Sequence, residues 1–380
     1  MNIYEKLGLN TLINAFGANT KIGGSLMAPE VVSAMKEASE HYVELADLLE
    51  ACGEKVAGLL QVPAAHITSG SAAGLCVATA ACMAGKDKAQ IYQLPDTTGL
   101  KNEVLIHRTH RNVYDQAIRM AGATLVEFSY ADKVEVWQLE EAITEKTAAV
   151  AYFAMFEDVC SRGTLPLAEI SQVCKKKNIP LIVDAAAELP PAANFRHFLE
   201  QGADLVIFSG GKDICGPQGT GLIVGCPELI EACVLNSNPN YSIGRPFKVD
   251  KEEIVGLTKA IELYTQQDFN KRMMVWKNQA RHMENSLAGI PGFQVVYVCP
   301  ASKASVGRPR IVPRVNICPE TQALKDSIPE MVRRLKDGSP AIAVNFDREN
   351  IILNTQMLKE GQEKIVAEKV KEVLLEYAPE

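Results

Sequence analysis

A single lysine, Lys212, lies between two apolar runs in a stretch made mostly of small residues. Residues 205–208 are rich in β-formers and predict a buried strand, which ends at Ser209 and two glycines directly before the lysine. A second glycine-rich segment, 216–221, leads into another apolar run. Burial lowers the pKa of a lysine amine and makes it a nucleophile toward carbonyl groups. A surface lysine beside a glycine-rich turn would produce the same local pattern.

Three other groups have types and positions that suit the same chemistry. Asp184 ends the apolar run 181–184, where a carboxylate can pair with a protonated ring nitrogen or cap the next helix. Ser69, Gly70 and Ser71 precede an alanine-rich segment, and a helix that begins there offers N–H groups to a phosphate or carries a serine N-cap. His110 follows an earlier strand and could stack on a flat ring or relay protons, although a lone loop histidine is more often structural.

The order of these groups along the chain is more specific than any one of them. The phosphate-type helix start comes first, then the strand-end Asp184, then Lys212. Pyridoxal 5'-phosphate uses all three, as an anion site, a carboxylate that keeps its ring cationic, and an amine. Other templates fail around Ser71, because the segment has no G-x-S-x-G, no Walker lysine and no G-x-G-x-x-G. We therefore expect pyridoxal phosphate to be the cofactor.

The elements that must position these groups alternate between strands and helices. Strand-like runs are followed by segments of helical period at 103–107 then 113–121, 123–128 then 139–143, 148–153 then 166–177, and 180–184 then 195–201. Such βαβ units predict an α/β fold with a mostly parallel sheet, whose ligands bind beyond the carboxyl ends of the strands. We expect residues 1–255 to form this large domain and 256–380 a small α+β domain, which the N-terminal segment can join.

The composition excludes several classes of protein. A formal net charge of -7 and a pI near 5.6 give no electrostatic footprint for nucleic acid or an anionic membrane. The 10 cysteines include no C-x-x-C pair, which favours reduced, mostly buried thiols over disulfides or a metal site. The N-terminus has no signal-peptide pattern, and no apolar run approaches the roughly 18 residues of a membrane span. We expect a cytoplasmic protein with a small-molecule amino substrate and no metal.

Four stretches carry a resemblance to a known family, namely residues 12–15, 181–188, 202–212 and 243–257. Through them the whole chain resembles the fold-type I pyridoxal-phosphate enzymes related to L-seryl-tRNA(Sec) selenium transferase. Within that group it is most similar to the ammonia lyases of amino-sugar acids. The resemblance implies a Schiff base on Lys212, Asp184 at the pyridinium nitrogen, and a homodimer or higher homo-oligomer with its site near the subunit boundary.

The resemblance also implies roles for residues outside the lysine–aspartate pair. The cofactor ring would contact Ala186 and His110, and its phosphate would contact Gly70, Ser71, Ala72 and Ser209. Arg245 and Lys248 would lie near the subunit boundary, close to the site. The candidates for holding the substrate are Arg314, which begins an apolar strand, Arg245, Lys248 and Asn14, with Arg308 and Arg310 as further arginines.

Two departures from the lyase pattern bear on the substrate. Phe16 stands where the lyases have a serine, and residues 341–346, which would bring an arginine, contain none. These departures point to a different or smaller substrate.

The expected reaction is an α,β-elimination. Lys212 would remove the α-proton of a β-hydroxy amino acid or amino-sugar acid, the hydroxyl would leave, and hydrolysis would yield a keto acid and ammonia. A racemase or an aldolase shares the first steps. A non-catalytic scaffold that retains the cofactor is an alternative from another class.

Overall fold

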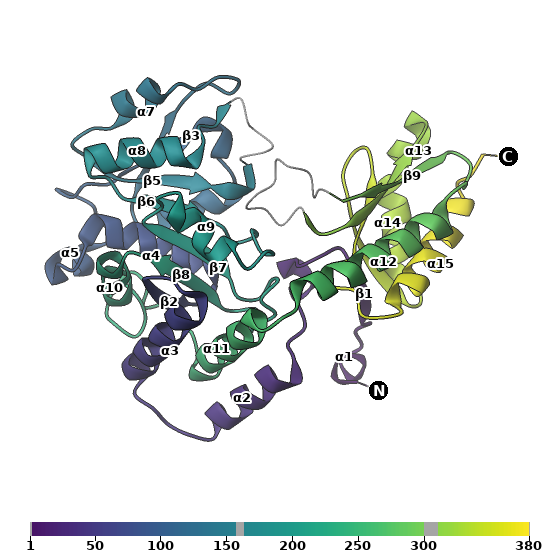
Figure 1. Cartoon of the computed structure of the whole chain (residues 1–380), viewed down its shortest axis with the longest axis horizontal. Coiled ribbons are helices and arrows are strands. Elements are labelled where there is room, and N and C mark those ends of the chain that lie inside the picture. Colours follow the sequence, from purple (N-terminus) through teal and green to yellow (C-terminus); the bar gives the residue numbers. More distant parts are fainter. Residues whose placement is uncertain (1, 157–162, 300–310, 380) are drawn as a thin grey trace. The chain divides into compact units, whose positions relative to one another are not determined.

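The computed structural model describes residues 2–156, 163–299 and 311–379, and the chain divides into two compact units (Figure 1). Met27–Gln266 form the larger unit, while Met1–Leu26 and Gln267–Glu380 together form the smaller one. The sequence placed the boundary at residue 255. In the structure α11 (Lys251–Thr265) belongs to the larger unit, because it packs along α2 (Pro29–Ser39) and α3 (Leu45–Leu60).

The larger unit is built on a seven-stranded sheet in the order β2-β8-β7-β6-β5-β3-β4. Neighbouring strands from β4 to β7 run parallel, whereas β8 is antiparallel to both β2 and β7. The central strands are apolar on both faces, as a sheet covered by helices on both sides requires. The strands are β2 (Ala64–Thr68), β3 (Glu103–His107), β4 (Thr124–Phe128), β5 (Thr147–Phe153), β6 (Leu181–Asp184), β7 (Leu205–Ser209) and β8 (Gly221–Gly225).

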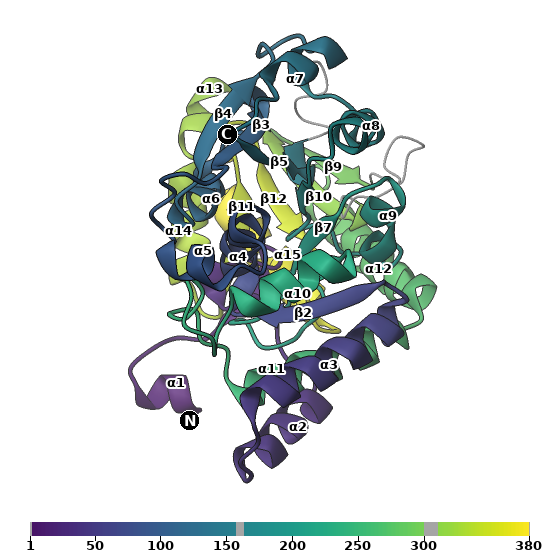
Figure 2. The same ribbon diagram turned by 90° about the vertical axis from the view of Figure 1, so that its left-hand side faces the viewer.

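Alternate residues of these strands belong to two apolar clusters. In β5, Val150 and Tyr152 join the cluster that includes residues of α3, α8 (Leu167–Lys177), α9 (Asn194–Glu200) and α11. Ala149 and Ala151 join the cluster of α4 (Gly70–Ala84), α5 (Lys88–Gln93), α6 (Gln116–Met120) and α10 (Pro227–Leu235). Figure 2 shows these helices around the sheet, together with α7 (Val136–Ala142).

One predicted helix is divided in the structure. Instead of a helix over 113–121, a 3-10 turn at Val113–Asp115 precedes the short α6. The Asn112 side chain accepts a hydrogen bond from the Tyr114 N–H at 2.8 Å, and the Asp115 carboxylate accepts one from the Asn112 N–H at 3.2 Å. These local bonds compete with the α-helical pattern, so the first turn is tightened.

The smaller unit has a five-stranded sheet in the order β1-β11-β12-β10-β9. The N-terminal strand β1 pairs in parallel with β11, which is why the N-terminal segment belongs to this unit. The apolar side chains of α12, α14 and α15 form a single cluster with the strands. The elements are α1 (Ile3–Lys6), β1 (Leu12–Ala15), α12 (Phe269–Leu287), β9 (Phe293–Val298), β10 (Arg314–Pro319), α13 (Gln322–Asp326), α14 (Ile328–Asp337), β11 (Ala341–Phe346), β12 (Ile351–Asn354) and α15 (Gln362–Leu375).

Within the described residues, the structure contains no helix with the length and apolar character needed to cross a membrane.

Candidate active site

Strand register brings the predicted groups of the larger unit to one edge of its sheet. Asp184, the last residue of β6, pairs with Ile207 of β7. Ser209 ends β7 and pairs with Gly221, and Gly221 in turn pairs with Thr68 at the end of β2. The carboxyl ends of β6, β7 and β2 therefore lie together with the start of α4, at the edge where parallel sheets bind ligands.

Lys212 follows β7 on a loop, residues 210–220, that we call the lysine loop. A Cβ atom added at Gly210 would lie 2.1 Å from the Thr220 Oγ1, and one at Gly211 would lie 2.4 Å from the Gln218 Cα. The Gly210 N–H donates to the Thr220 carbonyl at 2.9 Å, which fixes this contact. The two glycines are thus required because the two halves of the loop touch, and this contact sets where the lysine begins.

The Lys212 amine and the Asp184 carboxylate are partly buried and act on each other. Burial lowers the pKa of Lys212, while the negative charges of Asp184 and Glu188 raise it. Burial likewise raises the pKa of Asp184, while a 2.9 Å hydrogen bond from the Ala186 N–H and the charge of Lys212 lower it. For both groups burial is the larger effect, so the lysine gives up its proton more readily than an exposed one.

Glu188 also acts on the Lys212 amine, although its sequence context predicted no role for it. It is 3% exposed, and its N–H donates to the Ala185 carbonyl at 3.0 Å in a turn that follows Asp184. Glutamate is seldom buried this fully unless it acts on another charge. An acidic residue inside an otherwise apolar stretch after a strand end was the available signal.

The start of α4 is the place where the sequence predicts a phosphate site. Its first N–H groups, at Gly70, Ser71 and Ala72, have no carbonyl partner within the helix. A Cβ atom at Gly221 would lie 2.4 Å from the Gly70 carbonyl carbon and 2.7 Å from the Ser71 nitrogen, so β8 and the helix start are in contact. The Ser69 side chain makes no cap hydrogen bond, which removes the alternative of a serine N-cap.

His110 is fully buried and both of its ring nitrogens are hydrogen bonded. Nδ1 accepts the Phe153 N–H at 3.2 Å, so Nε2 carries the proton and donates to the Thr164 Oγ1 at 3.1 Å. Burial lowers the pKa of His110 to about 3. A neutral ring with both nitrogens engaged suits the predicted packing role better than a proton relay.

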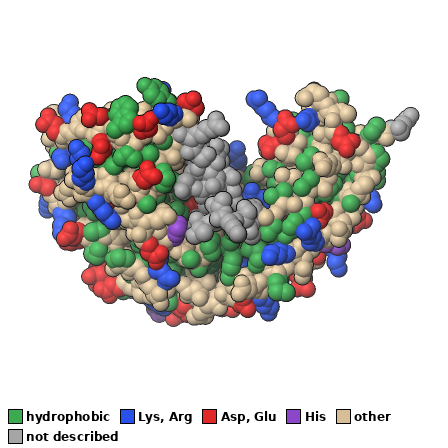
Figure 3. Space-filling model, turned by 45° about the horizontal axis from the view of Figure 1, so that its top comes forward, with side chains coloured by type: hydrophobic (Ala, Val, Ile, Leu, Met, Phe, Trp, Pro, Cys, Tyr) green, Lys and Arg blue, Asp and Glu red, His purple; other side chains and the backbone are tan. Residues whose placement is uncertain are grey.

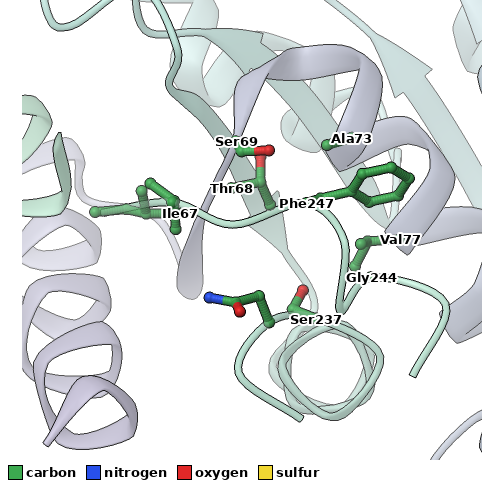
Figure 4. A pocket seen from close by; sticks show the side chains of 10 residues that line it. Ile67, Thr68, Ser69, Ala73, Val77, Ser237, Gly244 and Phe247 are labelled. Carbon is green, nitrogen blue, oxygen red and sulfur yellow. The ribbon is translucent and has the colours of Figure 1, made fainter. Parts of the chain in front are cut away.

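Arg245 and Lys248 lie on the segment that follows α10 in the larger unit. The Arg245 Nη1 donates to the Asn238 Oδ1 at 3.4 Å. Asn238 lines a small pocket, shown in Figure 4, whose other walls include Thr68, Ser69 and Phe247. This pocket lies beside the start of α4, so Arg245, through Asn238, lies near the start of that helix, while Lys248 is exposed.

The other predicted substrate residues lie in the smaller unit. The side-chain amide of Asn14 forms its hydrogen bonds within its own turn. Its Oδ1 accepts from the N–H groups of Phe16 and Gly17, and its Nδ2 donates to the Gly17 carbonyl. Arg314 begins β10, as predicted, and pairs with Asn354 of β12. Arg308 and Arg310 lie outside the described residues.

Comparisons with known proteins place this chain in a family. The model of the L-seryl-tRNA selenium transferase family matches residues 12–285. The chain belongs to this family. It is 39% identical over 269 residues to a D-glucosaminate-6-phosphate ammonia lyase of Salmonella typhimurium, covering 70% of each chain. It is 28% identical to a 5'-C-glycyluridine monooxygenase-decarboxylase of a Streptomyces species, covering 98% of this chain and 92% of that protein.

Solved structures agree with the family assignment. A structure of D-glucosaminate-6-phosphate ammonia lyase superposes with a TM-score of 0.83 at 31% identity, over 100% of this chain and 99% of the other. A Sphingomonas wittichii serine palmitoyltransferase, at 14% identity and a TM-score of 0.61, has the same fold. The predicted α/β fold is confirmed, and the chain is a pyridoxal phosphate-dependent enzyme. The contact between Gly221 and the start of α4, with Asp184 and Lys212 at the same edge, fits that cofactor.

We expect Gly221→Ala to weaken pyridoxal phosphate binding by about tenfold or more, the equivalent of one lost hydrogen bond to a charged group. The added Cβ would push the N–H of Ser71 out of place. The measurement is a titration of the absorbance of the bound cofactor. Gly58→Ala is the control, because its Cβ would meet nothing within 4 Å and its helical position favours alanine. Equal affinity in both variants would contradict a phosphate seat at α4.

Buried His66 predicts a stability that falls on acidification. Its Nε2 lies 2.9 Å from the Ser237 Oγ, and burial lowers its pKa from 6.5 to about 4. The unfolded chain therefore binds a proton that the folded chain excludes, and stability is lost as pH falls from 6.5 toward 4. The loss from His66 is about 2 kcal/mol between pH 6.5 and pH 5.

The corresponding experiment compares melting temperatures at pH 6.5 and pH 5. His66→Gln should lose part of the wild-type decrease, whereas His41→Gln, at an exposed position, should keep all of it. An unchanged decrease in His66→Gln would contradict the assignment.

Proposed function

We propose that this enzyme is an ammonia lyase that converts a β-hydroxy amino acid or an amino-sugar acid to a keto acid and ammonia. The observation that carries the proposal is the place of Lys212. In a chain 39% identical to a D-glucosaminate-6-phosphate ammonia lyase, its partly buried amine lies at the sheet edge where Asp184 and the start of α4 also lie.

Lys212 is the proposed base. Pyridoxal phosphate, when bound, supplies an aldehyde that captures the substrate amine and a ring that withdraws electrons from the α-carbon. The Lys212 Nζ then takes the α-proton, and burial, which lowers the pKa of this amine, favours the unprotonated form that a base requires. The same amine can return a proton to the product, because it remains at the reacting carbon.

The other residues of the larger unit hold the cofactor in place. The Asp184 carboxylate holds a proton on the ring nitrogen, since two partly buried groups of opposite charge favour each other. The N–H groups of Gly70, Ser71 and Ala72, with the Ser209 hydroxyl, hold the phosphate. Ala186 and the neutral ring of His110 pack against the flat ring.

The substrate is proposed to differ from the sugar phosphate named for the Salmonella relative. β11 carries no arginine, and position 16, where the family resemblance leads us to expect a serine, is Phe16. Arg314 is the proposed holder of the substrate carboxylate, because a guanidinium forms a two-point contact with carboxylates. Arg245 and Lys248 are the proposed second positive group. Asn14 is proposed to support the substrate site indirectly, since its amide maintains the turn at residues 14–17.

A small amino compound, rather than a tRNA, is the proposed partner. The chain carries a net charge of -7, and basic and acidic side chains are interspersed over the face shown in Figure 3. Tight binding of RNA needs a clustered basic surface. A homodimer or higher homo-oligomer in the cytoplasm remains part of the proposal.

We expect Asp184→Asn to keep the fold and much of the cofactor while kcat falls roughly a hundred- to a thousandfold. Without the carboxylate the ring nitrogen loses its proton and withdraws fewer electrons. Steady-state kinetics and circular dichroism provide the measurement. Asp204→Asn is the matched control, because Asp204 lies at the opposite end of β7 and accepts the Leu181 N–H at 2.8 Å. A near wild-type kcat in Asp184→Asn would limit this carboxylate to a structural role.

Turnover in heavy water separates elimination from the alternatives. An ammonia lyase should release keto acid deuterated at the β-carbon and an equal amount of ammonia, whereas a racemase returns amino acid deuterated at the α-carbon. An aldolase would release an aldehyde. Uptake of oxygen with loss of carbon dioxide would favour the chemistry named for the Streptomyces relative. Lys212→Ala should abolish turnover, and substrate inverted and deuterated without ammonia would overturn the lyase proposal.

A further inference from the structure

One face of α11 lies against the lysine loop along the whole helix. The contacts recur at the spacing of successive helical turns, so a single stripe of the helix makes them. The residues of this stripe are Glu253, Gly256, Leu257, Ala260 and Tyr264. From the sequence, the residues of α11 from position 256 onward were expected in the small domain, and no role in the site was predicted for them.

The loop and the helix are packed without space between them. A Cβ at Gly219 would lie 2.4 Å from the Glu253 Oε1, and one at Gly210 would lie 2.7 Å from the Leu257 Cδ1. A Cβ at Gly216 would meet Leu257 at 3.0 Å. Glycine in the loop therefore lets the backbone around Lys212 rest directly on α11.

A buried hydrogen bond ends this stripe next to the lysine. The Tyr264 hydroxyl donates to the Asp213 Oδ2 at 2.7 Å, and the two residues are 4% and 1% exposed. The Phe195 and Tyr264 rings pack in a T-shaped pair with centroids 5.9 Å apart, which limits movement of the phenol. A carboxylate buried this deeply requires donors, so the bond is strongly favoured.

Asp213 is well placed to control its neighbour. The two residues before Lys212 are glycines, which contribute no side chain to hold the backbone. On the other side, the Lys212 carbonyl accepts the Cys215 N–H at 3.0 Å, and the Asp213 side chain reaches α11. Of the two residues adjacent to Lys212, Asp213 is therefore the one whose side chain is held by a buried hydrogen bond.

We propose that Tyr264 is a positioning residue for Lys212. Its hydrogen bond to Asp213 fixes the backbone from which the lysine side chain starts, and so the direction in which Nζ meets the cofactor and the α-carbon. The inference rests on Lys212 as the proposed base. It does not depend on elimination, since a racemase would use the same amine.

The test compares Tyr264→Phe with wild type in the holoenzyme. We expect kcat to fall about 10- to 100-fold with KM within about threefold, because a small misplacement of the base affects the chemical step more than binding. The pH midpoint of the visible absorbance of the bound cofactor should move by at least about half a unit, since the field at Nζ changes with its position. Tyr92→Phe, on exposed α5, should match wild type in both.

Two further variants separate positioning from folding. Asp213→Asn keeps an oxygen that can accept from Tyr264, and should retain most of kcat, whereas Asp213→Ala should lose it to the same extent as Tyr264→Phe. If Tyr264→Phe does not fold, the comparison of Asp213→Asn with Asp213→Ala decides. Equal kcat values in these two variants would overturn the inference. A lowered melting temperature with unchanged kcat and unchanged absorbance midpoint would also overturn it. If the proposed reaction is wrong, the absorbance midpoint still tests the positioning role.

Discussion

The mutual stabilisation of the Lys212 amine and the Asp184 carboxylate, both partly removed from water, is the interaction on which the rest of the site depends. Burial disfavours the charge of each group, and the charge of the other favours it. Such a pair is maintained only where the surrounding backbone holds both charged groups in place. If one group is removed, the other is left as a buried charge without a partner. Here the adjacent strands β6 and β7 hold them, through the pairing of Asp184 with Ile207.

Close backbone contact is the second constraint. The lysine loop touches itself at Gly210 and Gly211, and β8 touches the start of α4 at Gly221. These approaches leave no room for a Cβ atom, so the glycines serve proximity rather than flexibility. They bring a helix N-terminus, whose first N–H groups have no partner within the helix, to the strand edge where the lysine emerges.

Much of the fold and of the site could be predicted from the sequence. The apolar runs predicted as strands are strands in the structure. Asp184 and Ser209, at the ends of two of them, lie at one edge of the sheet, because parallel strands have their carboxyl ends at the same edge. Local patterns failed where side chains compete with the helix, as in the 3-10 turn before α6. Local patterns also did not indicate that the side-chain amide of Asn14 would form its hydrogen bonds within its own turn.

The sequence by itself determined the kind of chemistry, since a lysine among glycines after a buried strand, a strand-end aspartate and a small-residue helix start are local features with a fixed order. Only the tertiary structure decided which other groups act on that lysine. Glu188, on the turn after β6, acts on the Lys212 amine through its charge. Tyr264 hydrogen bonds to the residue after the lysine, because α11 packs against the lysine loop. The tautomer of His110 was decided in the same way, by the N–H of Phe153 on a neighbouring strand. Periodicity identifies an element and its buried face. The atoms that lie opposite that face depend on how separate elements pack together.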